Sequence, residues 1–326
     1  MRAPGFWNDP PGLIAATLAP AGWLYSAATA RRVLQAGYRA QVPVICIGNL
    51  NVGGTGKTPT AIAMIERLVA RGRRVAVVSR GYGGSLTGPL QVVEAQHKAA
   101  EVGDEPLLLS AFAPTFIGRD RAGAVRLAER AGAEVILLDD GFQNPSVVKH
   151  LSIVVVDAAQ GFGNGLCLPA GPLREPVSAG LKRADLVLAI GDAASQDKFA
   201  ARWGALMARP VLHGVLNPLA MGLDWKGLRV IAFAGIGNPS KFFATLRGEG
   251  AEVVRAVALE DHQPLSEALM RRLELEAAAR GAQLVTTEKD AVRLPLRFRM
   301  QVLTLVVRLR LADWSLVDAG LENLGL

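Results

Sequence analysis

Residues 51–58 have the composition of a loop that binds phosphate groups. Glycines let backbone N–H groups converge on phosphate oxygens, and the N-terminus of a following helix adds partial positive charge. Lys57 is expected to reach the terminal phosphates, and Thr58 to bring its hydroxyl to Mg²⁺. The common pattern GxxxxGK[ST] begins with glycine, where this chain has asparagine. The predicted nucleotide-binding residues are Asn51, Val52, Gly53, Gly54, Thr55, Gly56, Lys57 and Thr58.

Two acidic residues, Asp139 and Asp140, end the apolar run 135–138. In phosphate-loop enzymes, a carboxylate at the carboxyl end of a neighbouring strand holds or orients Mg²⁺. Both acids are therefore predicted metal ligands, together with Thr58. Residues 287–290 contain the residue types with which GTP-binding proteins recognise guanine, but their lysine and aspartate are adjacent, which is the wrong spacing. We therefore expect ATP as the nucleotide.

The elements that must position these residues alternate between strands and helices. The β-branched run 42–48 predicts a buried strand before the glycine-rich turn, and the apolar spacing over 58–70 predicts a helix after it. Further strands are predicted at 75–79, 115–118, 135–139, 153–157, 185–190, 210–216, 229–234, 252–257, 283–286 and 301–307. This order predicts an α/β fold, a P-loop NTPase-like, doubly wound, mostly parallel sheet with a second, smaller α/β lobe.

Three regions are predicted along the chain: an N-terminal membrane-associated helical segment over 1–40, a phosphate-loop core domain over 41–222 and a C-terminal α/β lobe over 223–326. The N-terminal segment contains the apolar run 13–29, which is interrupted by Pro20 and is slightly shorter than the roughly 20 residues of a membrane-spanning helix. We expect a helix that lies in or against a membrane surface, and the alternative is a helix packed on its own domain. Residues suited to the headgroup region are Trp7, Trp23, Tyr25, Arg31, Arg32 and Arg39.

The composition excludes several classes of protein. With 326 residues, 50% hydrophobic and 20% charged, the chain is too apolar to be disordered. Its net charge of +7 is compatible with anionic partners, but its arginines are scattered and its aromatic residues are not interleaved with them, so we expect no binding of nucleic acid. Cys46 and Cys167 lack the spacing of a zinc site or a disulfide framework and are expected to be buried in a reducing cytoplasm.

Eight segments, taken together and in order, resemble the tetraacyldisaccharide 4'-kinase family of lipid A biosynthesis. They are VICIGNLNVGGTGKT (44–58), SRGYGG (79–84), VGDEP (102–106), GRDR (118–121), DDGFQ (139–143), LPAGPLREP (168–176), AFAGIGNP (232–239) and TTEKDA (286–291). The resemblance implies transfer of the γ-phosphate of ATP to the 4'-hydroxyl of tetraacyldisaccharide 1-phosphate, which gives lipid IVA. It also implies an N-terminal hydrophobic segment, as predicted above.

The resemblance implies roles for further residues. Asp104 corresponds to the family's expected general base, and it would work with His262, although the residues around His262 depart from the family's usual pattern. These two residues and Lys57 are the predicted catalytic residues. Glu175 is a predicted additional Mg²⁺ ligand, and the predicted substrate-binding residues are Arg80, Arg119 and Arg121, because guanidinium groups suit phosphate oxygens.

The predicted partners are the acylated disaccharide 1-phosphate lipid and the surface of the inner membrane. We expect a monomer at the cytoplasmic face of that membrane. The alternative function is a membrane-associated ATPase switch that controls a protein partner. Such ATPases carry a signature lysine just before the Gly-Gly pair, where this chain has Val52, so the alternative is disfavoured.

Overall fold

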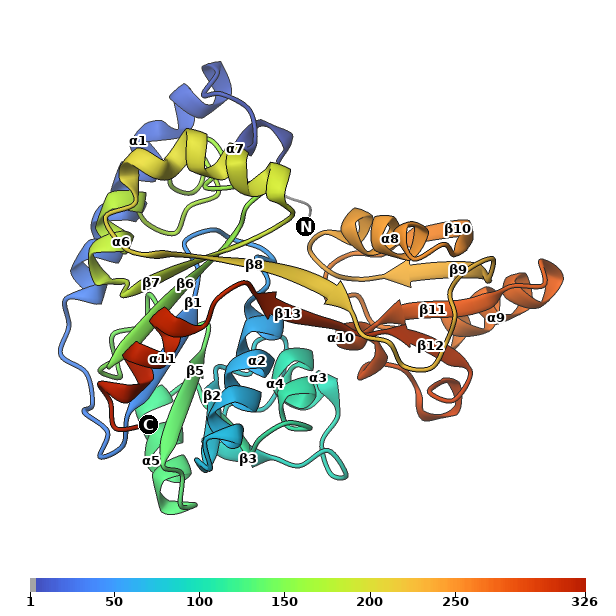
Figure 1. Ribbon diagram of the computed structural model, residues 1–326, viewed down its shortest axis with the longest axis horizontal. Helices are drawn as coiled ribbons and strands as arrows, with labels where there is room; N and C mark the ends of the chain where they lie inside the picture. Colours follow the sequence, from blue (N-terminus) through green and yellow to red (C-terminus); the bar gives the residue numbers. More distant parts are fainter. Residues whose placement is uncertain (1–3) are drawn as a thin grey trace.

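The computed structural model describes residues 4–326, so residues 1–3 of the predicted N-terminal segment lie outside the described residues. The described residues form two sheets (Figure 1). The large sheet has nine strands in the order β13-β8-β7-β6-β1-β5-β2-β4-β3, and the small sheet has four in the order β10-β9-β11-β12. We call the two units the large domain and the small lobe. The predicted α/β class, with a mostly parallel sheet and a second α/β lobe, is confirmed.

The large sheet is buried on both faces, which explains why its strands are nearly continuous apolar runs. Its strands are β1 (Val44–Gly48), β2 (Val75–Ser79), β3 (Leu90–Val92), β4 (Thr115–Ile117), β5 (Val135–Asp139), β6 (Leu151–Asp157), β7 (Leu186–Ile190), β8 (Val211–Pro218) and β13 (Val307–Leu311). All neighbouring pairs are parallel except those that β3 and β13 make at the two edges. The sequence did not predict β3, which has only three residues.

Alternate strand residues face opposite layers of helices. One face packs against α5 (Arg121–Arg130), α6 (Val177–Arg183) and α7 (Ala193–Trp203). The other face packs against α2 (Lys57–Ala70), α4 (Asp104–Leu109) and α11 (Ser315–Glu322). The short helix α3 (Ala99–Val102) precedes α4. Because α2 starts at the carboxyl end of the central strand β1, its N-terminus lies at the edge of the sheet where β5 and β6 also end.

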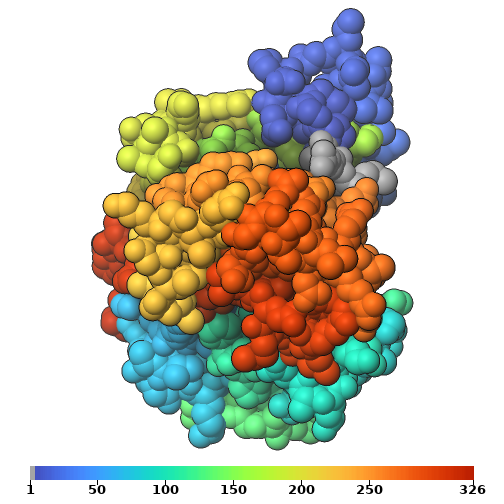
Figure 2. Space-filling view, turned by 90° about the vertical axis from the view of Figure 1, so that its right-hand side faces the viewer, coloured from blue at the N-terminus to red at the C-terminus, as the bar shows by residue number. Residues whose placement is uncertain are grey.

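The N-terminal segment consists of a short 3-10 helix (Gly5–Trp7) and α1 (Leu13–Val33), which contains Pro20. By length and composition alone, α1 is long and apolar enough to cross a membrane. One side of α1 packs on the large domain, where Ala15, Gly22 and Thr29 are buried. Figure 2 shows the segment projecting beyond the rest of the molecule.

The small lobe is a fully parallel sheet with helices on both faces. Its strands are β9 (Arg229–Ala234), β10 (Glu252–Ala258), β11 (Gln283–Thr287) and β12 (Val302–Leu305). One face is covered by α8 (Pro239–Gly248) and the other by α9 (Glu267–Ala279), and α10 (Glu288–Ala291) follows β11 directly.

The end of the chain departs from the predicted regions. Residues 223–326 were all assigned to the second lobe, but β13 pairs antiparallel with β8 and α11 packs on the large sheet. The predicted strand 301–307 is in fact two elements, because the chain leaves the small sheet at Leu305 and joins the large one at Val307. The chain therefore crosses between the two units twice, and β8 and β13 form the ribbon that joins them (Figure 1).

Candidate functional site

The glycine-rich turn between β1 and α2 has the geometry of an anion-binding loop. Gly53 and Gly56 have φ angles of 111° and 95°, in the left-handed region that favours glycine. A Cβ atom on Gly56 would also lie 2.7 Å from Cδ1 of Ile190. Within residues 4–326 no side chain caps the start of α2 at Lys57, so its first N–H groups are available to an anion.

Asn51 explains the departure from the common pattern. Its side chain is buried, and its Nδ2 donates to the carbonyl of Gly161 at 3.0 Å. The next residue, Val52, donates its backbone N–H to the carbonyl of Pro172 at 2.8 Å. Asn49 closes the turn from within, with Nδ2 3.1 Å from Oγ1 of Thr55. Asn51 therefore anchors the phosphate loop to the segment that contains Gly161, and a glycine at position 51 could not make this contact.

The two acids at the end of β5 lie next to this loop but differ in environment. Asp140, with a φ of 51°, has its carboxylate 3.6 Å from Nζ of Lys57 and 2.9 Å from Nη1 of Arg174. Burial would raise the pKa of Asp140, but the charges of Lys57 and Arg174 outweigh it and lower the pKa. Asp139 is fully buried and accepts a hydrogen bond from the hydroxyl of Ser79 at 3.2 Å. Burial is the largest cause, and together with nearby negative charges it raises the pKa of Asp139 to about 7.

The fit of this pair to Mg²⁺ rests on one orphaned atom. Oδ1 of Asp139 is buried and has no hydrogen-bond partner within residues 4–326, so it has an unused lone pair beside the phosphate loop. Thr58 is half-buried as the second residue of α2. Among the described residues, no three carboxylate, histidine or cysteine side chains are grouped to hold an ion by themselves. Mg²⁺ commonly takes only one or two carboxylates, with waters and phosphate oxygens as its other ligands.

The structure places Glu175 in a different role from the predicted one. Both of its carboxylate oxygens lie 2.5 Å from Nη2 of Arg183, and Oε1 also accepts from Nε2 of Gln143 at 2.9 Å. The same Gln143 nitrogen donates to the carbonyl of Asn49 at 2.9 Å. Glu175 is therefore occupied in supporting the phosphate loop, and we do not retain it as a metal ligand.

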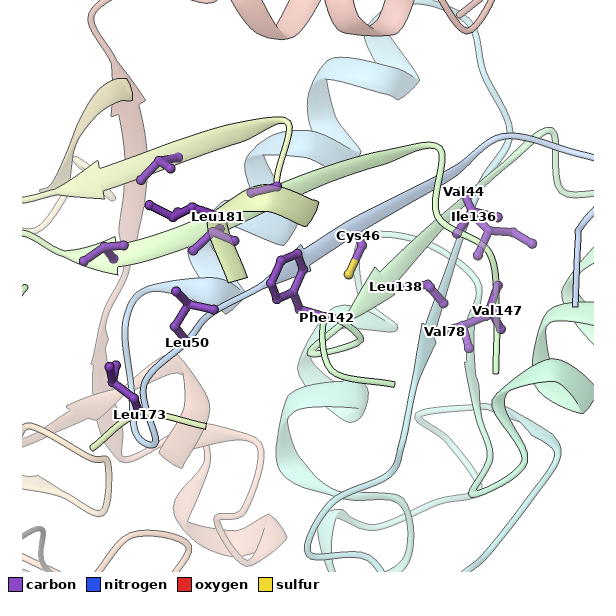
Figure 3. Packing of buried hydrophobic residues seen from close by; sticks show 14 of the residues in the cluster. Val44, Cys46, Leu50, Val78, Ile136, Leu138, Phe142, Val147, Leu173 and Leu181 are labelled. Carbon is purple, nitrogen blue, oxygen red and sulfur yellow. The ribbon is translucent and has the colours of Figure 1, made fainter. Parts of the chain in front are cut away.

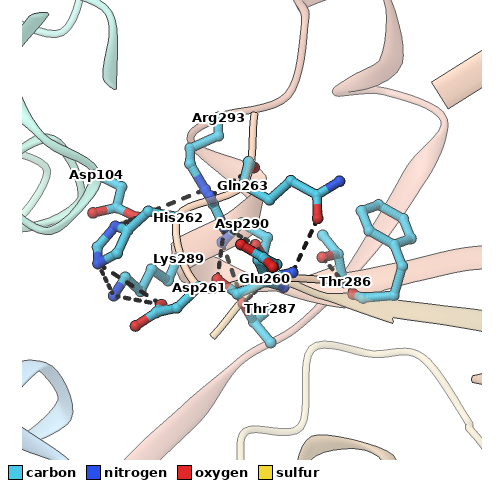
Figure 4. A network of polar contacts seen from close by, with 12 residues as sticks. Asp104, Glu260, Asp261, His262, Gln263, Thr286, Thr287, Lys289, Asp290 and Arg293 are labelled. Atoms are coloured by element: carbon cyan, nitrogen blue, oxygen red, sulfur yellow. Dashed lines mark hydrogen bonds and ion pairs between the residues drawn. The ribbon is translucent and has the colours of Figure 1, made fainter. Parts of the chain in front are cut away.

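Asp104 and His262 meet across the boundary between the large domain and the small lobe (Figure 4). Nδ1 of His262 donates to Oδ2 of Asp104 at 2.9 Å, although the two residues are 158 positions apart. Asp104 is the first residue of α4, and its side chain is 2% exposed, against 27% for His262. Burial would raise the pKa of Asp104, but the hydrogen bond from His262 and nearby cations lower it.

The small lobe holds His262 in a strained turn. Its φ is 59°, unusual for a residue other than glycine, and its backbone N–H donates to the carbonyl of Gly235 at 3.2 Å. The buried carboxylate of Asp290 accepts from the N–H of Gly235 at 3.1 Å and pairs with Arg293. Nε of Arg293 lies 3.6 Å from Asp104. These contacts tie the histidine turn to Gly235 after β9, to Asp290 on α10 and, through Arg293, to Asp104.

Lys289 links the Asp104–His262 pair to the acids of the phosphate site. Its Nζ lies 3.1 Å from Glu105, 3.5 Å from Nε2 of His262 and 3.8 Å from Asp261. Burial would lower the pKa of Lys289, but the charge of Glu105 and its neighbours outweighs it and raises the pKa. The negative charge of Glu105 is in turn close enough to raise the pKa of Asp139. The predicted phosphate, metal and base residues are thus part of one charged network.

Two more contacts join the small lobe to the large domain, one at the phosphate loop and one at the end of β6. A Cβ atom on Gly237 would lie 3.2 Å from the backbone nitrogen of Gly54. Nζ of Lys241, on α8, lies 2.5 Å from Oδ2 of Asp157 at the end of β6. The site therefore lies between the two units and takes residues from both.

The three predicted substrate arginines are not equivalent. Arg80 and Arg119 are exposed and follow β2 and β4, whose ends are joined by the bond from the Gly118 N–H to the carbonyl of Ser79 at 3.1 Å. Arg121 is 5% exposed, and its Nη2 donates to the backbone carbonyl of Asp140 at 3.2 Å. The prediction that Arg121 binds substrate does not fit this placement, because its guanidinium lies beneath the acidic turn.

The aromatic residues that were predicted to lie at the membrane surface also differ in their environments. Trp23 on α1 is 73% exposed. Trp7, however, donates its Nε1–H to the carbonyl of Pro169 at 3.1 Å, and Tyr25 packs against the large core. The large apolar residues of α1 that are exposed are Leu13, Ile14, Trp23 and Leu24.

Several residues of the site were missed by the sequence analysis. Arg174, Glu105 and Arg293 all lie in or next to segments already identified, in LREP, GDEP and after TTEKDA. Charged residues within such segments are the signal that could have found them. The positions of Arg183 and Lys149, discussed below, carried no such signal.

Comparisons with known proteins match almost the whole chain. The family model described as tetraacyldisaccharide-1-P 4'-kinase matches residues 14–324. A curated tetraacyldisaccharide 4'-kinase from Dinoroseobacter shibae is 59% identical, covering 99% of this chain and 98% of the relative. One of the same name from a Jannaschia species is 58% identical, covering 99% of both.

A solved structure has the same fold. The crystal structure of LpxK from Aquifex aeolicus, described as an "apo" form in complex with ATP, matches with a TM-score of 0.75. The match covers 96% of this chain and 99% of that one at 24% sequence identity. At this identity the likeness concerns the fold.

Proposed function

The chain belongs to the tetraacyldisaccharide-1-P 4'-kinase family, and from this premise we propose how its residues carry out the reaction. It is a lipid A biosynthesis kinase that transfers the γ-phosphate of ATP to the 4'-hydroxyl of tetraacyldisaccharide 1-phosphate. The observation that carries the mechanism is the meeting of Asp104 and His262 beside the phosphate loop, from opposite sides of the domain boundary. Phosphoryl transfer depends mainly on positioning, on charge neutralisation and on a group that takes the hydroxyl proton.

The triphosphate is bound by residues 51–58. The backbone N–H groups at the start of α2 hold the phosphate oxygens, and Lys57, which is released from Asp140 when phosphate enters, neutralises the terminal phosphates. Mg²⁺ would be held by Thr58, Asp139 and Asp140, with the orphaned Oδ1 of Asp139 as the first ligand. When bound, the ion neutralises charge that develops on the phosphates.

Asp104 is the general base for the 4'-hydroxyl, and His262 orients it. The lowered pKa of Asp104 keeps the carboxylate ionised at neutral pH. The lowered pKa also makes Asp104 a weak base. A weak base is sufficient when the transition state is loose and the proton leaves the hydroxyl late. Lys289 and Arg293 hold positive charge next to the pair and stabilise the ionised form of Asp104.

The lipid substrate is expected to meet two other features. Arg80 and Arg119 are exposed at the ends of neighbouring strands and are proposed to bind its 1-phosphate. The exposed apolar residues of α1 are proposed to lie in the interface of the cytoplasmic leaflet, with Arg31 and Arg32 near anionic headgroups. We expect the chain to act there as a monomer, without nucleic acid.

The direct test is a phosphorylation assay. Purified protein is incubated with γ-labelled ATP, Mg²⁺ and detergent-dispersed tetraacyldisaccharide 1-phosphate, and the lipids are separated by chromatography. Label is expected in a lipid with one more phosphate, and Lys57→Met should abolish it. Label released only as inorganic phosphate, at a rate independent of the lipid, would instead favour the ATPase switch, which the family match and Val52 both disfavour.

A further inference from the structure

The turn that begins at Asp140, directly after Asp139, has three cations bonded to its backbone carbonyl groups. The turn covers Asp140–Asn144, directly after β5, and the carbonyls of its alternate residues 140, 142 and 144 each accept one bond. Their donors are Arg121 Nη2 to Asp140 at 3.2 Å, Arg183 Nη1 to Phe142 at 3.1 Å and Lys149 Nζ to Asn144 at 2.6 Å. Three cations therefore hold the carbonyl groups of one short turn.

The turn has no room to relax around these bonds. Figure 3 shows Phe142 directed into the large core beside Cys46. A Cβ atom on Gly48 would lie 2.4 Å from the Cβ of Phe142, so the turn packs directly on the end of β1. The guanidinium of Arg183 lies 4.4 Å from the centre of the Phe142 ring, which adds a cation–π contact.

Arg121, Arg183 and Lys149 bring three positive charges close together, and these charges must be balanced by negative groups. Lys149 is half-buried, and burial, together with the nearby guanidiniums of Arg183 and Arg121, lowers its pKa. Gathering three cations under one turn is costly unless negative charge faces them. Asp139 and Asp140 supply negative charge close to Arg121, and Glu175 supplies it to Arg183. The left-handed φ of 51° at Asp140 needs support as well.

We propose that Lys149 and Arg183, with Arg121, are positioning residues that fix the acidic turn so that Asp139 and Asp140 face the phosphate loop and Mg²⁺. This inference rests on the proposed function of the two acids. Lys149 acts through the backbone of the turn, whereas Arg183 acts through that backbone, through the ring of Phe142 and through its ion pair with Glu175. Groups that orient metal ligands from behind typically change metal affinity or activity about 10- to 100-fold when they are removed.

The primary variant is Lys149→Met, which removes one cation and one bond to the turn. The half-saturating Mg²⁺ concentration of the kinase reaction should rise about tenfold. Lys149→Arg should stay close to the unmodified enzyme. The matched control is Arg74→Met, because Nε of Arg74 donates to the carbonyl of Gly132, in the turn that leads into the other end of β5.

A second readout uses the metal-free protein and does not depend on activity. The backbone N–H of Asp140 donates to Ile47 at 3.0 Å and that of Asn144 to Gly141 at 3.1 Å. Hydrogen exchange of these two amides should be faster in Lys149→Met by about tenfold or more, and unchanged in Arg74→Met. Equal exchange in both variants, or a lowered Tm without any change in the Mg²⁺ dependence, would overturn the proposal. An unmodified enzyme that phosphorylates no lipid would instead overturn the proposed function.

Discussion

At the scale of single residues, the chemistry depends on carboxylates whose environments push their pKa values apart. Asp104 and Asp139 are both buried, yet cations around the first lower its pKa while burial raises that of the second to about 7. The first group stays ionised and is suited to accept a proton. The second is only partly ionised near pH 7, and a bound cation would favour its ionised form, which suits a metal ligand.

Replacing Asp104 by asparagine should separate catalysis from binding. Asp104→Asn keeps the size of the side chain but removes the base, so kcat should fall about 10²- to 10⁴-fold. Binding of ATP should change less than about threefold. Steady-state kinetics and calorimetric titration measure the two effects, with Asp197→Asn, on the exposed surface of α7, as control. A fall in kcat of less than about threefold would show that Asp104 is not the general base.

Asp139 should make the stability of the metal-free enzyme depend on pH. Its pKa in the folded state, about 7, lies above the roughly 3.9 of an unfolded chain. Ionisation therefore costs stability, and the free energy of unfolding should fall as pH rises from about 4 to 7, by at most about 1.4 kcal/mol per pH unit from this group. Urea unfolding is measured at pH 5, 6, 7 and 8. The free energy of unfolding of Asp139→Asn should rise relative to that of the unmodified protein up to pH 7. A constant difference between the two proteins would contradict the assignment.

At the scale of elements, a strand-turn-helix unit and an N-terminal helix position the chemistry. The sequence was sufficient to predict α2 and nearly all strands of both sheets, because their apolar periodicity is local. It was not sufficient for β13, which continues the run of β12 after one residue but pairs in the other sheet. The misassigned Glu175 and Arg121 have a related cause, since Gln143, which bonds to Glu175, and the Asp140 carbonyl, which bonds to Arg121, lie 32 and 19 positions away along the chain.

The left-handed glycine at the start of α2 offers a test of the phosphate loop. Gly56→Ala combines a strained φ of 95° with a contact at 2.7 Å to Ile190, so the loop must shift. ATP binding should weaken about tenfold or more. Gly72→Ala, at the other end of α2, has a φ of 74° but meets nothing within 4 Å, so it carries only the backbone cost of about 1–2 kcal/mol. Calorimetric Kd values that change equally in both variants would contradict the role of this turn.

The exposed side of α1 should determine binding to membranes. Leu24 is 75% exposed, and Leu24→Glu places a charge where an apolar side chain would enter the lipid interface. Co-sedimentation with anionic vesicles should fall about tenfold or more, because charged residues partition poorly into lipid. Leu275→Glu on α9 is the control, since Leu275 is 72% exposed on the small lobe. Equal losses in both variants would place the membrane contact elsewhere.

At the scale of the whole molecule, the active groups are assembled only when the two units are together. The ribbon of β8 and β13 joins them, and Arg308 on β13 reaches Glu288 of the small lobe at 2.8 Å and Glu66 of α2 at 3.9 Å. On the other side of the site, Lys241 reaches Asp157. Nucleotide exchange requires access between these contacts, so closure is expected to control how long ATP stays bound.

The Lys241–Asp157 ion pair should affect nucleotide release more than chemistry. Lys241 is half exposed, so the pair contributes modestly to stability. Lys241→Ala should speed the release of a fluorescent ATP analogue about three- to tenfold in stopped-flow measurements, while kcat at saturating ATP changes less than about twofold. Lys226→Ala, just before the start of β9 at the other end of the small sheet, should leave release unchanged. Unchanged release in Lys241→Ala would show that this contact does not retain the nucleotide.

A crystal structure of this enzyme with Mg²⁺ and a non-hydrolysable ATP analogue tests the assembled site most directly. The γ-phosphate should lie against Lys57 at the start of α2, with the ion on Asp139 and with Asp104 facing the γ-phosphate across a gap wide enough for one sugar hydroxyl. An analogue bound away from residues 51–58, or an Asp104 separated from the γ-phosphate by other side chains, would contradict the account.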